Sequence, residues 1–404
     1  MYNEVVNSVR ASGKERAAQL CRHVITSEYP PQSGGVSDYT HGVATGLAAE
    51  GDEVHVWCPA CPGPQPQADG VVVHRELGSL TPADLRRVGR QLDQYPSPRH
   101  ILVQWVPHGY GYRSMNLAFC WWLRNRAVRH RDRVEIMVHE PYLTFRADSF
   151  RQSAAAFVHR LMTMMLLHVV ERVWVSIPEW ERRWRPYALG RRVPFQWLPV
   201  ASNIPVAQNP SRVQEIRRTY NAGGNFLVGH FGTYGWPIAC LLEPILTALD
   251  DESIGYKILL MGKGSKKFHA EFVRKHPRLV RRMQAAGALS PEELSYHLAA
   301  CDVLVQPYPD GASSRRGSLL AGLSHGKPIV TTEGPHSEPF WKRSGALALA
   351  PAGDTQAFVF LVRQLQSDPA ERARMGEAAR MLYQERFDIS YTIAALRQTA
   401  ICAS

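Results

Sequence analysis

Short runs of hydrophobic residues alternate with longer segments of helical periodicity along most of the chain. This alternation is typical of βαβ units, in which a helix connects two parallel strands. A helix is expected over about 37–49, where Gly51 stops it. The strands predicted in the first half are Arg22–Thr26, Glu53–Trp57, Val71–Arg75, His100–Val106, Val134–His139, Arg172–Ser176 and Phe195–Leu198. These elements form one doubly wound half.

The same pattern restarts after residue 225. A helix follows Pro237, and Ser290 with Glu293 forms a capping box that opens another helix. The strands predicted here are Phe226–Phe231, Lys257–Met261, Asp302–Gln306 and Pro328–Thr331. The segment 199–225, rich in proline and glycine, is interpreted as a linker, and the chain is expected to be helical after Asp354.

The predicted fold class is therefore α/β, with two Rossmann-like doubly wound domains that face a cleft. We assign residues 1–200 to the first domain and 201–385 to the second. The last helix, about 386–404, is expected to pack back on the first domain. A length of 404 residues and 45.4 kDa agrees with two domains, because a single hydrophobic core stops growing at about 250–300 residues.

Composition indicates a globular protein, since 45% of the residues are hydrophobic and 21% are charged. The longest apolar stretch, Phe157–Val170, is shorter than the roughly 20 residues that cross a bilayer. The first 20 residues lack the apolar core of a secretory signal. Seven cysteines, an odd number, favour free thiols and a cytoplasmic location. We interpret the Cys58–Cys61 pair as part of a loop rather than a zinc site, because no second CxxC occurs.

A net charge of +11 favours anionic partners, which include nucleic acids, lipid headgroups and nucleotide diphosphates. The sequence has neither a basic low-complexity tail nor zinc-finger spacing, and we therefore predict no nucleic-acid partner.

Two strand-to-helix turns carry candidate chemistry. Gly34 and Gly35 follow the first strand, where ligands bind in open α/β sheets, but neither GxGxxG nor GK[ST] spacing is present. The turn 310–320 offers hydroxyl groups and two arginines, Arg315 and Arg316, that suit the oxygens of a diphosphate. The alternative interpretations are a plain glycine turn and a solvated helix cap.

These segments occur in the order found in retaining GT-B glycosyltransferases of family 4 (glycosyl transferases group 1), which the chain resembles over nearly all its length. The matching segments are 29–36, 47–54, His139-Glu140, 229–233, 261–264, 289–294, 300–307 and 323–332. The resemblance implies a hexosyl or other glycosyl transferase of carbohydrate or natural-product biosynthesis. Its donor would be a UDP- or GDP-linked sugar, and its acceptor a small molecule or a glycan.

The resemblance also implies the site residues. His139 would contact the donor sugar, and Leu289 would contact the base. The candidate diphosphate ligands are Gly232, Thr233, Lys263, Ser313, Ser314, Gly317, Ser318 and Leu319. The candidate acceptor-side residues are Gly34, Gly35, His108, Glu140 and Tyr142.

Two departures from the family pattern bear on catalysis. Ser313 and Ala321 stand where the Glu-x7-Glu carboxylates are expected, and Asp310 and Glu333 are the nearest acids that could substitute. The loop 231–236 lacks the usual Arg and Lys, whose charge Arg315, Arg316 and Lys263 could restore. The candidate catalytic residues are His139, Asp310, Arg315 and Arg316.

The sequence has no DxD-like acid cluster beside a phosphate turn, and we expect transfer without a metal or cofactor. Two alternatives stay open. One is an inactive nucleotide-sugar-binding or scaffolding relative. The other is a lipid-glycan enzyme at the inner face of the membrane, seated by the Arg-aromatic stretches 121–126 and 174–187. The plain interpretation of these stretches is amphipathic packing. Donor base, acceptor and oligomeric state are left open.

Overall fold

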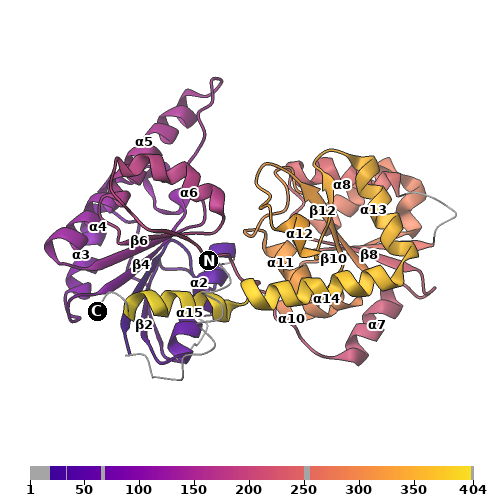
Figure 1. The fold of residues 1–404 in the computed structure, drawn as a ribbon, viewed down its shortest axis with the longest axis horizontal. Coiled ribbons are helices and arrows are strands. Elements are labelled where there is room, and N and C mark those ends of the chain that lie inside the picture. Colours follow the sequence, from indigo (N-terminus) through magenta and orange to yellow (C-terminus); the bar gives the residue numbers. More distant parts are fainter. Residues whose placement is uncertain (1–18, 33, 65–68, 250–254, 402–404) are drawn as a thin grey trace.

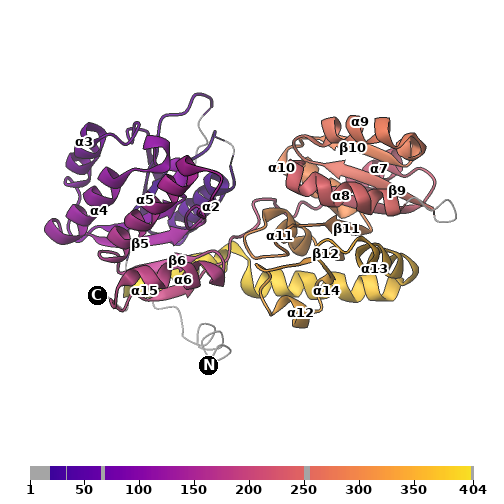
Figure 2. The ribbon, with the colours of Figure 1, turned by 90° about the horizontal axis from the view of Figure 1, so that it is seen from above.

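The computed structural model describes residues 19–32, 34–64, 69–249 and 255–401. It consists of two α/β domains that lie side by side (Figures 1 and 2). Residues 1–18 of the predicted first domain and residues 402–404 of the predicted last helix lie outside the described residues. Within the described part, no helix is both long enough and apolar enough to span a membrane.

The first domain is built on a parallel seven-stranded sheet with the order β3-β2-β1-β4-β5-β6-β7. Its strands are β1 (Cys21–Thr26), β2 (Glu53–Trp57), β3 (Val71–His74), β4 (His100–Trp105), β5 (Arg133–Val138), β6 (Arg172–Val175) and β7 (Phe195–Trp197). The direction of winding reverses between β1 and β4, which pair with each other. In such sheets the space outside the carboxyl ends at this reversal is where ligands bind.

The second domain repeats this plan with six parallel strands in the order β10-β9-β8-β11-β12-β13. Its strands are β8 (Phe226–Phe231), β9 (Tyr256–Met261), β10 (Met283–Gly287), β11 (Val303–Gln306), β12 (Ile329–Glu333) and β13 (Ala348–Pro351). Here the winding reverses between β8 and β11. The predicted class of two Rossmann-like parallel-sheet domains is confirmed.

Helices connect the strands and cover the sheets (Figure 1). Those of the first half are α2 (Gly35–Ala49), α3 (Pro82–Leu92), α4 (Leu117–Arg129), α5 (Phe150–Leu167) and α6 (Pro178–Trp184). Those of the second half are α7 (Pro210–Tyr220), α8 (Trp236–Ala248), α9 (Ser265–Lys275), α10 (Pro291–Ala300), α11 (Gly317–Ser324), α12 (Trp341–Ser344), α13 (Thr355–Ser367), α14 (Pro369–Arg386) and α15 (Ile389–Ile401). Short 3-10 segments occur at Pro107–Gly109, Tyr112–Ser114, Arg185–Ala188 and Pro277–Arg281.

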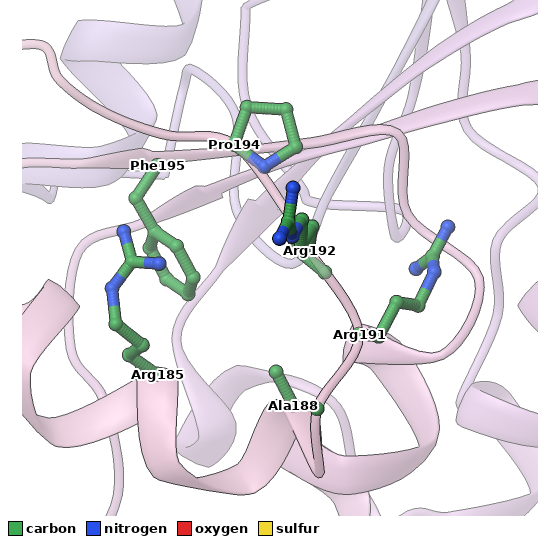
Figure 3. A pocket seen from close by; sticks show the side chains of 8 residues that line it. Arg185, Ala188, Arg191, Arg192, Pro194 and Phe195 are labelled. Carbon is green, nitrogen blue, oxygen red and sulfur yellow. The ribbon is translucent and has the colours of Figure 1, made fainter.

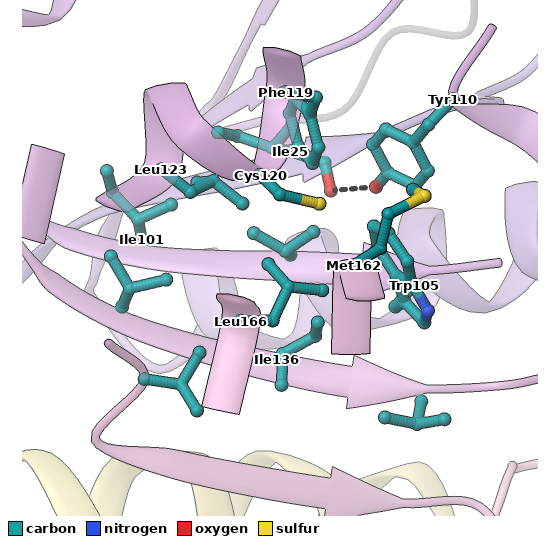
Figure 4. Close-up of a cluster of buried hydrophobic side chains, with 14 of the residues drawn as sticks. Ile25, Ile101, Trp105, Tyr110, Phe119, Cys120, Leu123, Ile136, Met162 and Leu166 are labelled. Atoms are coloured by element: carbon teal, nitrogen blue, oxygen red, sulfur yellow. Dashed lines mark hydrogen bonds between the residues drawn. The ribbon is translucent and has the colours of Figure 1, made fainter. Parts of the chain in front are cut away.

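The core of the first domain packs aliphatic strand residues against aromatic rings, as Figure 4 shows around Trp105 and Phe119. Tyr110 is fully buried, and its hydroxyl lies 2.7 Å from the Gln104 carbonyl oxygen and 3.4 Å from that of Ile25. A buried phenol needs such a partner. These bonds tie the segment after β4 to the end of β1, the region where candidate acceptor residues lie.

The structure corrects several sequence expectations. Strands β10 and β13 were not predicted, because their sequences MQAAG and ALAP are short and poor in β-branched residues. The predicted linker contains α7, which Asn209 caps and Pro210 opens. The predicted capping box is half formed: the Ser290 hydroxyl accepts from the Glu293 N–H, whereas the Glu293 carboxylate pairs with Arg212 at 3.0 Å.

Helices α14 and α15 follow one another along the same side of both domains (Figure 1). Helix α15 leaves the second domain and packs against α2 of the first. Glycine permits this contact, because a Cβ added at Gly46 would lie only 2.7 Å from Cδ1 of Ile393. At Gly42, one turn earlier, the nearest atom is Ile389 Cδ1 at 3.8 Å.

We therefore predict that Gly46→Ala destabilises the protein relative to Gly42→Ala. Alanine raises helix propensity at both positions by up to about 1 kcal/mol. Only at Gly46 does the methyl group overpack the α2–α15 contact, at a cost of about 1–3 kcal/mol. Urea unfolding of both variants measures the difference, and equal stabilities would show that this contact tolerates the methyl group.

Candidate functional site

The candidate site begins with the turn between β11 and α11, which is held by the loop after β12. Gly311 has a φ of +86°, and a Cβ there would lie 2.3 Å from the Gly334 nitrogen. The Ala312 N–H donates to the Thr332 carbonyl oxygen at 2.8 Å. Because the backbones of the turn and the loop lie this close together, the turn has little room to change conformation. The positions of its side chains are therefore fixed.

Asp310 occupies the centre of a cationic cluster on this turn. Its carboxylate accepts from Arg315 at 2.7 Å, from His336 Nδ1 at 2.9 Å and from Arg316. The Arg316 guanidinium also lies 4.7 Å from the centroid of the Tyr308 ring. The structure thus brings three predicted catalytic residues together: Asp310, Arg315 and Arg316. The Asp310 carboxylate is bound by the two arginines and is not left open for a sugar.

The electrostatics of Asp310 follow from these contacts. Burial by itself would raise its pKa, but the positive charges of Arg316 and Arg315 and the hydrogen bond from His336 outweigh burial and lower the pKa. The carboxylate is therefore ionised at neutral pH. Its negative charge keeps two mutually repelling guanidinium groups at adjacent positions.

The cluster continues across to the first domain through α6. The Arg315 guanidinium lies 5.5 Å from the centroid of the Trp180 ring, and the His336 ring lies 5.7 Å from it. Arg183 Nη2 lies 3.4 Å from His336 Nε2. The indole N–H of Trp180 donates to the His139 carbonyl oxygen at 3.0 Å. The carboxyl ends of the two sheets therefore meet at this place.

His139 directly follows β5 and is buried. Its Nε2 lies 2.7 Å from Oε1 of Gln104, an oxygen that can only accept, and the ring proton therefore sits on Nε2. Burial lowers the pKa of His139 to about 3. At neutral pH the imidazole is uncharged, and its Nδ1 offers a lone pair.

Ser314, a predicted diphosphate ligand, lies at a contact between the domains. Its hydroxyl lies 2.9 Å from the Ser176 carbonyl oxygen and 2.5 Å from the Glu338 carboxylate, and it accepts from Trp197 Nε1 at 3.2 Å. Its N–H donates to Glu338 at 3.0 Å. All hydrogen-bonding capacity of Ser314 is thus used within the protein.

The beginning of α11 has different properties. No side chain among the described residues caps this helix, and its first turn contains no acidic residue. Gly317 is its first residue, followed by Ser318, whose hydroxyl lies 2.8 Å from the Tyr308 hydroxyl, and the buried Leu319. The Ser313 hydroxyl is fully buried without a described partner. First-turn N–H groups have no intrahelical acceptor, so this end is suited to an anion.

The loops after β8, β9 and β10 lie against each other. Gly262 has a φ of +108°, and a Cβ there would lie 2.3 Å from the Gly232 carbonyl oxygen. The Gly262 N–H donates to the Gly287 carbonyl oxygen at 2.9 Å. This contact groups three predicted ligands on one edge: Thr233 and Lys263 are exposed, and Leu289 is half-buried.

On the first domain, Gly34 and Gly35 open α2. A Cβ at Gly34 would lie 2.5 Å from Glu28 Oε1, whereas a Cβ at Gly35 would meet no described atom within 4 Å. The Glu28 carboxylate accepts from the Ser37 N–H at 3.0 Å, and it therefore already supplies a negative charge at this helix end.

The remaining acceptor-side candidates divide into two kinds. His108 and Glu140 are half-exposed, and their side chains lie 3.6 Å apart. Tyr142 donates its hydroxyl to the Arg183 carbonyl oxygen at 3.0 Å, and the Arg160 guanidinium lies 4.3 Å from its ring centroid. Tyr142 therefore packs within the first domain, and its hydroxyl is not free to contact an acceptor.

Sequence reasoning missed several residues of this site. Glu338 and His336 follow β12, and the rule that ligands bind at carboxyl ends of strands would have found them. Trp180 and Arg183 belong to the stretch 174–187, for which amphipathic packing was the plain interpretation and membrane contact the alternative. His230, near the end of β8, donates from Nδ1 to the Val305 carbonyl oxygen at 2.7 Å and buries Nε2 without a described partner.

A separate hollow of about 730 Å³ opens on the first domain beside β7 (Figure 3). Arg185, Arg191 and Phe195 line it, and it includes none of the predicted site residues. Arg185 pairs with Glu181, and Arg191 donates to backbone carbonyl oxygens of Leu167 and Val170. Arg185 and Arg191 are thus engaged by the protein itself, and Arg192 is the third arginine of the lining.

The architecture is that of the GT-B glycosyltransferases. The chain is similar to HepE from Anabaena in complex with UDP, at 16% identity and a TM-score of 0.68, over 95% of this chain and 100% of that one. It is similar to a sucrose-phosphate synthase from Thermosynechococcus elongatus, at 15% identity and 0.68 over the same shares. It is also similar to WaaG, a glycosyltransferase involved in lipopolysaccharide biosynthesis, at 16% identity and 0.63, over 94% of this chain and 98% of that one.

A family model described as glycosyl transferases group 1 matches residues 226–368, which hold most of the second domain. No curated protein sequence matches the chain. The family match and the fold together support a glycosyltransferase of the GT-B type.

We predict that Arg315→Ala and Arg316→Ala each weaken UDP binding. Each removes a charge-assisted hydrogen-bond donor worth about 1.5–3 kcal/mol, which corresponds to a loss of roughly 10- to 150-fold in affinity. Isothermal titration with UDP measures this loss.

The matched control is Arg182→Ala, an exposed arginine on α6 whose nearest carboxylate, that of Glu179, is 3.7 Å away. This variant should retain affinity within about threefold, well under the 1.4 kcal/mol of a tenfold change. Unchanged affinity in both the Arg315 and the Arg316 variant would place the diphosphate elsewhere.

Proposed function

We propose that the chain transfers a sugar from a UDP- or GDP-linked donor to an acceptor hydroxyl group, with retention of anomeric configuration and without a metal. The observation that carries this proposal is the pair Arg315 and Arg316, held by Asp310 at the carboxyl edge of the second sheet and opposite the first domain. The UDP and UDP-glucose complexes of HepE, a protein of the same fold, support a nucleotide-sugar donor.

In the proposed reaction the acceptor oxygen bonds to the anomeric carbon on the face that the diphosphate leaves. The bond from that carbon to the phosphate oxygen breaks, and the acceptor proton passes to the departing phosphate. The products are a glycoside and a nucleoside diphosphate. Arg315, Arg316 and the N-terminus of α11 stabilise the negative charge that develops on the phosphate.

Asp310 acts in this proposal as a positioning residue for the two arginines. A bound diphosphate would offer the guanidinium groups additional acceptors, while His336 keeps its hydrogen bond to Asp310. Because the arginines are ordered before the donor arrives, less side-chain entropy is lost on binding.

His139 contributes as a neutral group. Its Nδ1 lone pair can accept a hydrogen bond from a sugar hydroxyl, and its uncharged state follows from burial. Ser313 offers a buried hydroxyl at the position of the first family glutamate. His139 is the proposed partner of the donor sugar in place of the missing carboxylates, and Ser313, which is fully inaccessible in this structure, would reach the sugar only after the turn moves.

The test is a screen of UDP-, GDP- and dTDP-sugars, first for thermal stabilisation and then for product formation with acceptor mixtures. A ligand that binds only the folded state raises the melting temperature. We expect a UDP- or GDP-sugar to stabilise the protein and the product to keep the donor's anomeric configuration by NMR. Donor binding without any product would favour the binding or scaffolding alternative, and an inverted product would contradict retention.

The Gly35→Val variant tests, in the same assay, whether nucleotide binding and acceptor binding belong to different domains. A Cβ added at Gly35 meets no described atom within 4 Å, and we therefore expect the variant to fold and to bind nucleotide normally. Its turnover should fall, because the side chain would fill the space that we assign to the acceptor.

A membrane-peripheral enzyme is a second candidate, favoured by exposed aromatic residues on one projection. The amino end of α5 and the loop before it extend from the first domain (Figure 1). Phe145, Phe150 and Phe157 are 55%, 88% and 57% exposed there. By contrast, Trp174, Trp180 and Trp184 of the predicted seat at 174–187 are buried, which removes that stretch from the membrane hypothesis.

Flotation with vesicles of anionic and neutral lipids tests this candidate. If the projection binds to the cytoplasmic face of a membrane through its aromatic side chains, Phe150→Asp should reduce flotation with anionic vesicles severalfold. Phe360→Asp, which changes a phenylalanine of α13 that is 66% exposed, is the matched control and should float like the unmodified protein. Absence of flotation would leave a cytoplasmic enzyme that acts on a dissolved acceptor.

A further inference from the structure

A cluster of metal-ligating side chains lies on one face of the first sheet, outside the site described above. Cys21 on β1 is the register partner of Glu53 on β2, and His23 is that of His55. Side chains two residues apart on a strand share a face. The parallel register therefore places a thiol, a carboxylate and two imidazoles next to each other at the amino ends of these strands.

Three of these groups present ligand atoms at a common point. The Cys21 thiol sulfur, a Glu53 carboxylate oxygen and a ring nitrogen of His55 all lie within 4.8 Å of one another. His55 Nε2 is 2.9 Å from Glu53 Oε1. Zinc bonds of about 2.0–2.3 Å in a tetrahedron separate the ligand atoms by about 3.3–3.7 Å, so small rotations of these side chains suffice.

The other ring nitrogen of His55, Nδ1, has hydrogen-bond partners of the kind that usually orient a metal-bound histidine. Nδ1 lies 3.0 Å from His74 Nε2 and 3.3 Å from the Tyr95 hydroxyl. The ring nitrogen of His74 and the Tyr95 hydroxyl oxygen each offer a lone pair that can accept a hydrogen bond from Nδ1. When Nε2 binds a metal, the ring proton moves to Nδ1, where a partner is already in place.

His23 is excluded as a fourth ligand by its own hydrogen bond. The indole N–H of Trp57 donates to His23 Nδ1 at 3.2 Å, and the proton of the neutral ring is therefore on Nε2, the nitrogen that faces Cys21. The positive charges of the nearby Arg99 and Arg126 are partly compensated by Asp132, which accepts from them at 2.7 and 2.6 Å.

We propose that Cys21, Glu53 and His55 form a binding site for Zn²⁺, with a water molecule in the fourth position. On binding, the Cys21 thiol releases its proton to solvent and the thiolate bonds to the metal. The site lies at the opposite end of β1 from the predicted acceptor-side residues Gly34 and Gly35, and a six-residue strand spans about 17 Å. The bound ion joins the starts of β1 and β2 and stabilises this edge of the first domain.

Cobalt is the probe, because a thiolate bound to Co²⁺ produces a charge-transfer absorption band. The full chain, treated with chelator, is titrated with Co²⁺ and then with Zn²⁺ in competition. We expect one Co²⁺ per chain with the thiolate band and its displacement by Zn²⁺. Cys21→Ala should abolish the band, and both Cys21→Ala and Glu53→Gln should weaken Zn²⁺ affinity at least tenfold.

Cys240→Ser, which changes an exposed thiol of the second domain, is the matched control and should leave band and affinity unchanged. UDP affinity, measured on the same samples, shows that each variant is folded and keeps this test separate from the proposed transfer reaction. A band that survives Cys21→Ala, or Zn²⁺ binding that is equal in all variants, would mean adventitious metal binding only and would overturn the proposal.

Discussion

The arrangement of the two domains depends on a buried carboxylate, that of Glu338. It accepts from the Ser314 N–H and from Trp341 Nε1 at 2.7 Å, and the Ser314 hydroxyl joins it to the Ser176 carbonyl oxygen of the first domain. Burial raises the pKa of Glu338, and these hydrogen bonds oppose the rise. A buried polar group of this kind is tolerated only when it is partnered: the direct partners of Glu338 belong to the second domain, and the Ser314 hydroxyl extends the network to the first. The same contact places the turn 310–316 opposite α6, so the position of the arginines depends on it.

The cluster around Asp310 gives a physical account of how the site differs from the family pattern. Two guanidinium groups side by side repel, and without a diphosphate they need a negative charge nearby. Asp310 supplies it from within the same turn, and His336 adds a third donor. The positions of the two family glutamates hold a buried serine and Ala321, both fully inaccessible. The negative charge of this site therefore lies on the turn, next to the two arginines.

Much of the fold was predictable from sequence, because strands such as 226–231 and 303–306 are continuous hydrophobic runs between turn residues. Strands β10 and β13 were missed because alanine and glycine carry little strand preference, and α7 because proline at its first position looks like a linker. The site was predictable only in part. The sequence indicated Arg315 and Arg316. The number of residues between them and Asp310 does not show, however, that the turn brings the Asp310 carboxylate into contact with both arginines. Contacts of Trp180 and Ser314 across the domains depend on docking, which no local pattern encodes.

The two helix N-termini at the site explain why the domains would take different ligands. Helix α2 begins beside the Glu28 carboxylate, which accepts from Ser37, and carries Asp38 in its first turn. Its positive dipole end is already neutralised, so a second anion would be repelled, whereas the hydroxyl groups of an acceptor can donate to these oxygens. Helix α11 begins with Arg316 as its N-cap, has no acidic residue in its first turn, and lies beside Arg315. A diphosphate there meets dipole and guanidinium charges of favourable sign. In the proposed reaction, the charge at each helix end, more than the similar shape of the two sheets, would direct the anionic donor to the second domain and would leave the first to a neutral acceptor.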